Sequence, residues 1–156
     1  MVTTPRTRRA MAGLTLVELV VAMALLALLT TLAAPAMSRL MTSQRLKTAA
    51  SNLHLALVKT RSEALKRNTN VTLSRTDGNW SNGWTIEAGA TQIDTAPAAK
   101  GVTVSAGATT SIVYAPNGRV STGAGSVFVL SATGVNPRCV SIDSSGRPYA
   151  KEGSTC

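Results

Sequence analysis

Aromatic residues are scarce in this sequence. Only five of its 156 residues are aromatic: Trp80, Trp84, Tyr114, Phe128 and Tyr149. Proteins that bind single-stranded nucleic acid stack successive bases on aromatic side chains. The small number of aromatic residues argues against a stacking platform of that kind.

Histidine and cysteine are almost absent as well. The two cysteines alone cannot supply the four ligands of a structural zinc site. The one histidine, His54, falls in an expected helix, where a surface or packing role is commoner than catalysis. Asp77, Asp94 and Asp143 fall in separate expected loops without the spacing of paired catalytic carboxylates. The sequence therefore predicts no metal site, no cofactor and no enzymatic activity.

Acidic residues are few. Seven Asp and Glu stand against sixteen Lys and Arg, which gives a formal charge of +9. Such an excess favours an anionic surface or partner, such as lipid headgroups, an acidic neighbouring subunit or nucleic acid. Simple solubility accounts for the same excess, so the composition alone leaves both interpretations open.

Charge is missing altogether from residues 19–38. A helix of this length rises about 30 Å, which is the thickness of the hydrocarbon core of a bilayer. Glu18 stands at the start of the apolar run, where a carboxylate is costly to bury and needs a partner. The run is too long for a secretory signal peptide, and no cleavage site of small residues closes it. An ordinary signal anchor would leave Glu18 unexplained.

The residues around Glu18 form a motif, Gly13-Leu14-Thr15-Leu16-Val17-Glu18, behind the basic residues Arg6, Arg8 and Arg9. It resembles the N-terminus of type IV pilins and type II secretion pseudopilins. The resemblance implies that a prepilin peptidase cuts between Gly13 and Leu14 and then N-methylates Leu14. Pro35 falls where many pilins carry a helix-interrupting proline.

Cleavage would give Glu18 a partner. It would create an ammonium on Leu14, and in a fibre core this ammonium would neutralise Glu18 of a neighbouring subunit. A buried charge pair adds little net stability, but a register that leaves Glu18 unpaired is penalised. We therefore expect Glu18 to specify how subunits align during assembly.

The helix is predicted to continue beyond the apolar run, because Met37 to Asn68 contains neither Gly nor Pro. Apolar residues recur at helical spacing, and Glu63 and Arg67 form a favourable i,i+4 pair. We expect one helix from about Leu14 to Arg67, with a bend at Pro35 and an end at Asn68-Thr69-Asn70. The predicted apolar stripe comprises Leu46, Ala50, Leu53, Leu57 and Ala64, broadened by Leu55, Val58 and Leu65.

After Asn70 short apolar runs alternate with turn residues, which predicts strands. The residues from Gly89 to Gly101 are expected to form a loop. The prediction is an α+β fold, with a long helix packed on a C-terminal domain of antiparallel sheets. The expected divisions are a leader (1–13), a membrane or fibre-core half-helix (14–38), an amphipathic half-helix (39–68) and a β domain (69–156). The predicted strands are Val71–Ser74, Trp84–Glu87, Val102–Ser105, Ser111–Tyr114, Val127–Ser131 and Cys139–Ile142.

Further motifs resemble the GspH/FimT branch of minor pilins and pseudopilins. They are Lys59–Asn68 with Val71-Thr72-Leu73, Trp80-x-x-Gly83-Trp84, the run Ile112–Gly118, and Ser145-Gly146-Arg147. The resemblance implies two antiparallel sheets against the helix. It also implies a minor component of a type IV pilus or of a type II secretion pseudopilus. The implied partners are the prepilin peptidase, other minor pilins or pseudopilins, the major pilin and the inner membrane.

Some FimT relatives bind DNA during natural transformation, and there the resemblance points to a C-terminal Gly-Arg-x-Arg motif. This chain has Gly146-Arg147-Pro148-Tyr149, so Tyr149 replaces the second arginine. We expect weak binding of double-stranded DNA if the fold gathers the tail cations. Otherwise Arg147 caps a turn or faces solvent. The candidate DNA contacts are Arg147, Lys151, Arg138 and Arg119.

Cys139 and Cys156 are the only cysteines, and a bond between them would pin the C-terminal tail. Closing a loop of about 16 residues contributes about 3 kcal/mol in the chain-entropy model. Such a bond needs an oxidising compartment, which agrees with a single-pass protein whose domain is exported to the periplasm. Flanking charges support this orientation weakly, because Arg39, Arg45 and Lys47 closely follow the apolar run.

Overall fold

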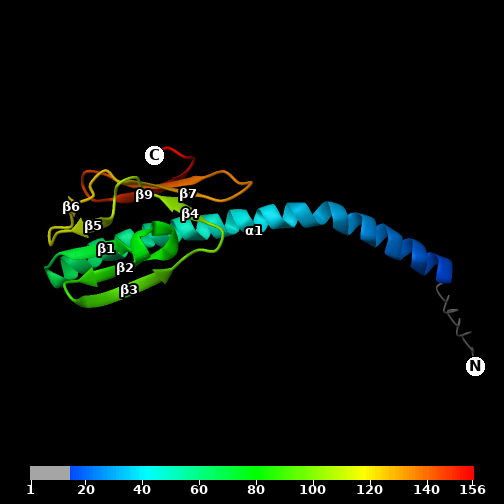
Figure 1. Cartoon of the computed structure of the whole chain (residues 1–156), viewed down its shortest axis with the longest axis horizontal. Coiled ribbons are helices and arrows are strands. Elements are labelled where there is room, and N and C mark those ends of the chain that lie inside the picture. Colours follow the sequence, from blue (N-terminus) through cyan, green and yellow to red (C-terminus); the bar gives the residue numbers. More distant parts are fainter. Residues whose placement is uncertain (1–14) are drawn as a thin grey trace, which may run out of the picture. The chain divides into compact units, whose positions relative to one another are not determined.

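The structure is a computed structural model that describes residues 15–156, and for residues 32–35 it describes the backbone alone. Among these residues it contains a single α-helix, α1 (Leu16–Arg67), followed by nine strands. Contacts divide the chain into two compact units, with the division between Met37 and Ser38. Figure 1 shows the order of the elements along the chain.

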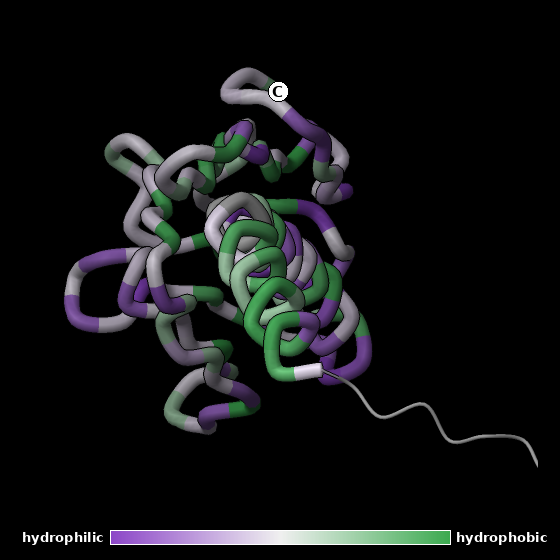
Figure 2. The backbone as a smooth tube through the Cα atoms, turned by 90° about the vertical axis from the view of Figure 1, so that its right-hand side faces the viewer, coloured by the Kyte–Doolittle hydropathy of each residue, from purple (hydrophilic) through white to green (hydrophobic). Residues whose placement is uncertain are grey.

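Beyond Glu18, the helical part of the first unit has no charged residue. Every side chain described between Leu16 and Thr31 is exposed, and the helix is long and apolar enough to cross a membrane. Figure 2 shows this part, which follows the grey trace, almost entirely in the hydrophobic colour. Its hydroxyls are satisfied internally, because Thr30 donates to the carbonyl of Ala27 and Thr31 to that of Leu28, at 2.8 and 2.7 Å. The backbone stays helical through Pro35, and the bend there stays a prediction.

The second unit contains two antiparallel sheets, which confirms the predicted fold class. One has the strand order β3-β2-β1-β5-β6 and the other the order β4-β7-β8-β9. The strands of the first sheet are β1 (Val71–Arg75), β2 (Gly83–Ala88), β3 (Thr91–Pro97), β5 (Ser111–Tyr114) and β6 (Val120–Thr122). Those of the second are β4 (Thr103–Ser105), β7 (Val127–Ser131), β8 (Arg138–Ile142) and β9 (Pro148–Glu152). Two 3-10 turns, η1 (Thr76–Gly78) and η2 (Trp80–Asn82), connect β1 to β2.

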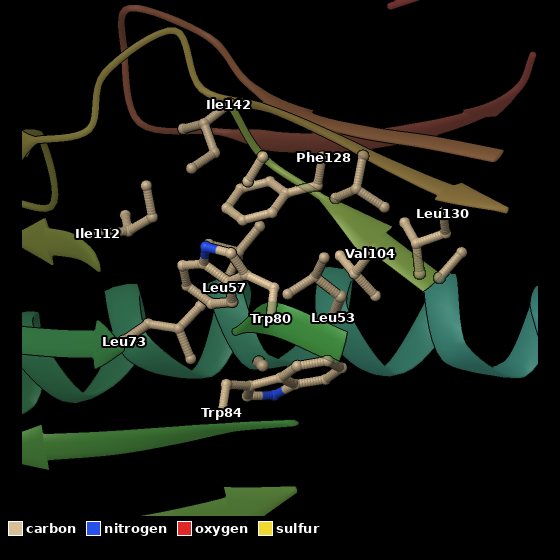
Figure 3. Close-up of a cluster of buried hydrophobic side chains, with 14 of the residues drawn as sticks. Leu53, Leu57, Leu73, Trp80, Trp84, Val104, Ile112, Phe128, Leu130 and Ile142 are labelled. Carbon is tan, nitrogen blue, oxygen red and sulfur yellow. The ribbon is translucent and has the colours of Figure 1, made fainter. Parts of the chain in front are cut away.

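The core of the second unit lies between the helix and the two sheets (Figure 3). On the first sheet, Leu73 of β1 is paired with Ile86 on one side and Ile112 on the other, and all three are buried. Trp80 meets Phe128 of β7 edge to face, with ring centroids 4.9 Å apart, and its indole N–H donates to the carbonyl of Thr109. The aromatic pair thereby joins the η2 turn to the second sheet.

The predicted apolar stripe of the helix is confirmed. Its five members are at most 2% exposed, and Ala49, Ala56 and Thr60 are buried beside them. The hydroxyl of Thr60 donates to the carbonyl of Ala56 at 2.6 Å, so this buried polar group is satisfied. The stripe comprises Leu46, Ala50, Leu53, Leu57 and Ala64.

The predicted broadening of this stripe is wrong. Leu55, Val58 and Leu65 are 60%, 41% and 52% exposed. At about 100° per residue Leu55 projects opposite the buried stripe, whereas Val58 and Leu65 project from its flank, roughly 100–120° away. Within the second unit, the sheets therefore bury one side of the helix and leave these side chains partly or mostly exposed.

The predicted loop at 89–101 is also wrong, because it contains β3, which pairs with β2. Strands β6 and β9 were not predicted from the sequence either. These three strands lie at sheet edges, and most of their residues are exposed or half-buried. They lack the apolar alternation that identifies a strand in sequence, since backbone pairing with a neighbour is what holds them.

The helix ends where the sequence predicts. Asn68 adopts a left-handed conformation with φ of 50°, which Asn tolerates better than most residues. The guanidinium of Arg67 donates to the carboxylate of Glu63 at 2.6 Å, which confirms the expected i,i+4 pair. This hydrogen bond is the main reason why the pKa of Glu63 is lowered.

Candidate functional site

Glu18 takes part in a reciprocal cap at the start of α1. The backbone N–H of Glu18 donates to the hydroxyl of Thr15 at 3.3 Å, while the N–H and hydroxyl of Thr15 donate to the Glu18 carboxylate at 3.4 and 3.3 Å. This is the capping box formed by a Thr at the N-cap and a Glu three residues later. The pattern Thr15-x-x-Glu18 is itself the sequence signature of this cap, which was not among the predictions.

The cap gives Glu18 a second role beside the predicted pairing between subunits. A carboxylate in the first helical turn is also stabilised by the positive end of the helix dipole. Gly13 and Leu14, where processing is predicted, lie outside the described residues. The side chain of Pro35 is not described either, so these assignments stay predictions.

Two hairpin turns come together next to Arg147. Residues 115–119 connect β5 to β6, and residues 143–147 connect β8 to β9. A Cβ placed on Gly146 would lie 2.7 Å from the carbonyl oxygen of Gly118 and 3.3 Å from the Cα of Arg119. The hydroxyl of Tyr114 donates to the carbonyl of Gly146 at 2.9 Å. We call these two segments the distal turns.

Asp143 organises one of the distal turns. Its Oδ1 accepts from the N–H and hydroxyl of Ser145, at 2.9 and 2.6 Å, and from the N–H of Arg147 at 2.8 Å. Its Oδ2 lies 3.3 Å from Nε of Arg147. The hydrogen bond from the Ser145 hydroxyl, followed by that from the backbone N–H of Arg147, lowers the pKa of the Asp143 carboxyl. The Arg147 side chain stays 76% exposed, so it can reach a partner in solvent.

The structure divides the four candidate DNA contacts into two pairs. Arg119 and Arg147 belong to the distal turns. Arg138 and Lys151 lie at the other end of the β8–β9 hairpin, where Lys151 pairs with Cys139 and Arg138 approaches Glu152 at 4.0 Å. The five residues of β8 separate the pairs by about 14 Å at roughly 3.4 Å per residue. The fold therefore gathers Arg147 with Arg119 and not with Arg138.

The C-terminal tail is joined to the second sheet by a disulfide between Cys139 and Cys156, as the sequence analysis considered. Their Cα atoms lie 5.8 Å apart. Cys139 is fully buried in β8, and the N–H of Gly153 donates to the carbonyl of Pro137 at 2.8 Å. The bond holds the last residues against β8, next to Arg138.

Residues 15–156 contain no group of three His, Cys, Asp or Glu side chains that could hold a metal ion. Nε2 of His54 lies 3.3 Å from the carbonyl of Pro148, between α1 and the start of β9. This contact gives the single histidine a packing position between two elements.

Two family models match the chain. Residues 8–34 match the prokaryotic N-terminal methylation motif, and residues 49–146 match the type II transport protein GspH. No curated protein matches the chain.

The fold is similar to that of the type IV minor pilin FimU from Pseudomonas aeruginosa, strain PAO1, in two crystal forms. The P21 structure has a TM-score of 0.64 and 22% identity, covering 73% of this chain and 96% of FimU. The P65 structure has a TM-score of 0.61 and 22% identity, covering 71% of this chain and 99% of FimU. At this identity the likeness concerns the fold.

A methylation motif that opens an apolar helix, together with a two-sheet domain on the second half of that helix, defines a pilin-like structural subunit. Within this class the chain belongs to the GspH family, whose model covers residues 49–146. This family consists of minor pilins and pseudopilins and not of enzymes.

Proposed function

We propose that this chain is a minor pilin that helps to initiate assembly of a type IV pilus. It is made as a prepilin, inserted in the inner membrane with its β domain in the periplasm, cut between Gly13 and Leu14, and N-methylated on Leu14. It then joins other minor pilins and the major pilin. The methylation motif at residues 8–34 carries the processing part of this proposal, and the fold that the chain shares with the type IV minor pilin FimU favours the pilus.

Features of both units support the proposal. The apolar side chains of residues 16–31 are all exposed, so they need lipid or neighbouring helices to cover them. The Cys139–Cys156 disulfide agrees with an oxidising compartment such as the periplasm.

A pair of Glu18 variants tests the assembly role. Glu18→Gln keeps a side chain that can complete the capping box at the third position of the helix. It removes the charge that would pair with the Leu14 ammonium. Glu18→Val removes both. We expect both variants to insert and to be processed, and both to lose incorporation into the fibre or its priming complex.

Mass spectrometry of the purified native protein should find a chain that begins at N-methylated Leu14.

Two results would contradict the proposal. A chain that still begins at Met1 in peptidase-positive cells would exclude processing. Normal piliation by Glu18→Gln, with a defect confined to Glu18→Val, would show that Glu18 acts through the cap and not through charge pairing. As a processing control, a large side chain in Gly13→Val should leave the leader attached.

A type II secretion pseudopilin is the alternative within the family, and the GspH match favours it. Deletion of the gene separates the two. Loss of pili and twitching supports the pilin, whereas periplasmic retention of secreted enzymes supports the pseudopilin. Neighbouring genes for minor prepilins or for general secretion provide a second indication.

A receptor for DNA uptake is a further candidate. The specific observation is that Arg119 and Arg147 both lie on the distal turns, with exposed side chains. Arg147 is already in contact with Asp143, and two cations provide few phosphate contacts, so we expect this binding to be weak.

A further inference from the structure

Positive charges gather at the end of the second unit where its helical segment begins. Arg39, Arg45 and Lys47 lie in the first three turns of that segment. Lys100 comes from the loop between β3 and β4, and Arg138 begins β8. We call these five residues the basal cations.

Four of the five basal cations, all except Lys47, line two grooves of the second unit. Arg39 and Arg138 line a groove of about 430 Å³ together with Leu40, Val135 and Glu152. Arg45 and Lys100 line another of about 360 Å³. Both volumes fall in the range of small-molecule clefts, roughly 300–1,000 Å³. The first groove combines cations with apolar side chains, which is the chemistry that suits an amphipathic ligand.

Little negative charge compensates the basal cations. Glu152 is the only acid that lines either groove, and it lies 4.0 Å from Arg138. Among the ion pairs of residues 15–156, none involves Arg39, Arg45, Lys47 or Lys100. All four of these side chains are exposed. In contrast, Lys59, Lys66, Arg67 and Arg147, farther along the unit, each lie within 4.0 Å of an acid.

Chain connectivity brings these charges close to a membrane surface. Arg39 directly follows the uncharged residues 19–38, whatever the angle between the two units. From Arg39 to Lys47 the helix rises about 12 Å. The headgroup layer of one leaflet is about 5–8 Å thick, and screening lengths in physiological salt are about 8 Å. Arg39, Arg45 and Lys47 therefore fall within electrostatic reach of phosphates at the surface from which an inserted helix emerges.

We propose that the basal cations bind the phosphate groups of anionic phospholipids and thereby seat the second unit on the membrane before assembly. The inference rests on the proposed membrane insertion but not on the choice between pilus and secretion. The proposal explains why three cations follow the apolar run. The positive-inside rule places an excess of Lys and Arg on the cytoplasmic side of the membrane, and these three residues would lie on the opposite, exported side.

The surroundings favour lipid over nucleic acid. Leu40 and Met41, next to Arg39, are 54% and 55% exposed, and apolar side chains beside cations suit the boundary between headgroups and acyl chains. To reach Arg39, Arg45 and Lys47, a DNA duplex would have to approach within about 12 Å, along the helix, of the end of the apolar run. A lipid headgroup is already present there once residues 14–38 are inserted.

The second unit by itself is suitable for the test. Among the side chains that the structure describes, the buried hydrophobic residues run from Leu46 to Ile142 and all lie within residues 38–156, so this unit contains its own core. Flotation measures how much of the second unit binds to vesicles. Neutral vesicles consist of phosphatidylcholine, and anionic vesicles also contain about one-third phosphatidylglycerol. We expect binding to the anionic vesicles only, weakening as salt is added.

Two triple variants with the same loss of charge make the test specific. The basal variant is Arg39→Gln/Arg45→Gln/Lys47→Gln, and the control variant is Lys66→Gln/Arg119→Gln/Arg147→Gln. All six side chains are exposed, so both variants should fold, which their melting curves check. At about fivefold per cation, the basal variant should lose about 100-fold in partitioning, and the control should stay within about threefold of the wild type.

Three outcomes would overturn the inference. Equal losses in both variants would show attraction by net charge alone. Displacement by millimolar glycerol phosphate, but not by chloride of equal ionic strength, would assign the groove to a free phosphate compound. Duplex DNA binding that the basal variant abolishes, without any preference for anionic vesicles, would assign the surface to nucleic acid. Because the test omits residues 1–37, its failure leaves the processing proposal intact.

Discussion

At Gly146 the backbone adopts a conformation and a position that a side chain would not allow. Its φ is 83°, and a Cβ would meet the carbonyl oxygen of Gly118 at 2.7 Å. Its own carbonyl accepts the hydrogen bond of the buried Tyr114 hydroxyl. The glycine of the Gly-Arg tail motif is therefore explained by the packing of the two distal turns, and only Arg147 remains as a functional candidate.

Gly146→Ala should lower the unfolding free energy of the second unit by about 2–4 kcal/mol. A left-handed conformation costs a residue with a Cβ about 1–2 kcal/mol, and displacement of Gly118 adds to it. Gly134→Ala is the matched control, because Gly134 has φ of 76° and nothing within 4 Å of the added Cβ. Urea unfolding measures both variants, and equal losses would rule out the steric part of the explanation.

Burial raises the pKa of Tyr114 to about 12, with a smaller contribution from Asp143 and an opposing one from Arg61. The unfolded chain releases the phenolic proton of Tyr114 near pH 10, whereas the folded protein keeps it up to about pH 12. The contribution of Tyr114 to the free energy of unfolding is therefore complete below pH 10 and is lost as the pH rises towards 12. We expect a loss of about 2–3 kcal/mol over this interval.

Tyr114→Phe is the control for this pH dependence. It should be less stable at neutral pH by about 1–3 kcal/mol, because the carbonyl of Gly146 loses its donor. Its unfolding free energy should lack the component lost above pH 10. Parallel pH profiles for the two proteins would contradict the assignment to Tyr114.

At the scale of elements, the second half of α1 has two different sides. One carries the buried stripe that includes Leu53 and Leu57, and the other exposes Leu55, Val58 and Leu65. Both sides contain apolar residues, although the exposed side also carries Asn52, Lys59 and Lys66, so an apolar residue alone does not indicate which side is buried. The sheets of the unit cover one side only, which leaves Leu55, Val58 and Leu65 partly or mostly exposed.

Leucine-to-alanine substitutions on the two sides should have different effects. Leu57→Ala removes a fully buried side chain and should cost about 2–5 kcal/mol, whereas Leu55→Ala should change stability by less than about 0.5 kcal/mol. Thermal or urea unfolding of the second unit measures the difference. Similar losses at both positions would mean that Leu55 is buried in solution.

At the scale of the whole chain, positive charge is concentrated in separate regions. The distal turns carry Arg119 and Arg147, and the other end of the second unit carries the basal cations. Because the two regions are separate, substitutions in the distal turns test DNA binding, and substitutions of the basal cations test binding to anionic phospholipids. A strongly basic composition by itself would not permit that distinction.

DNA binding, if the distal turns provide it, should involve about two phosphate contacts. The logarithm of affinity should then fall with the logarithm of salt concentration with a slope of about −1.8. Arg147→Gln should reduce that slope by about one, while Arg138→Gln should leave it unchanged. The measurement is a titration of residues 38–156 with duplex DNA between about 50 and 200 mM salt. No binding at the lowest salt, or equal effects of both variants, would exclude this surface as a DNA receptor.

The sequence by itself determined the helix, the fold class and the family. These depend on signals that are local or periodic: an uncharged run at 19–38, the motif from Gly13 to Glu18, and the buried stripe from Leu46 to Ala64. The capping box of Thr15 and Glu18 was equally local and could have been found. Such patterns can be interpreted before folding because neighbours in the chain or on one helix face produce them.

Only the tertiary structure decided the edge strands, the uncovered side of the helix and the grouping of the cations. β3, β6 and β9 form because a neighbouring strand offers unpaired backbone groups, which their own residues do not reveal. Arg147 lies near Arg119, 28 positions earlier, because Gly146 lets two turns come into contact. Arg138, nine positions before Arg147, lies at the other end of the same hairpin. Distance along the chain does not determine which charges meet, since that depends on how the sheets pack.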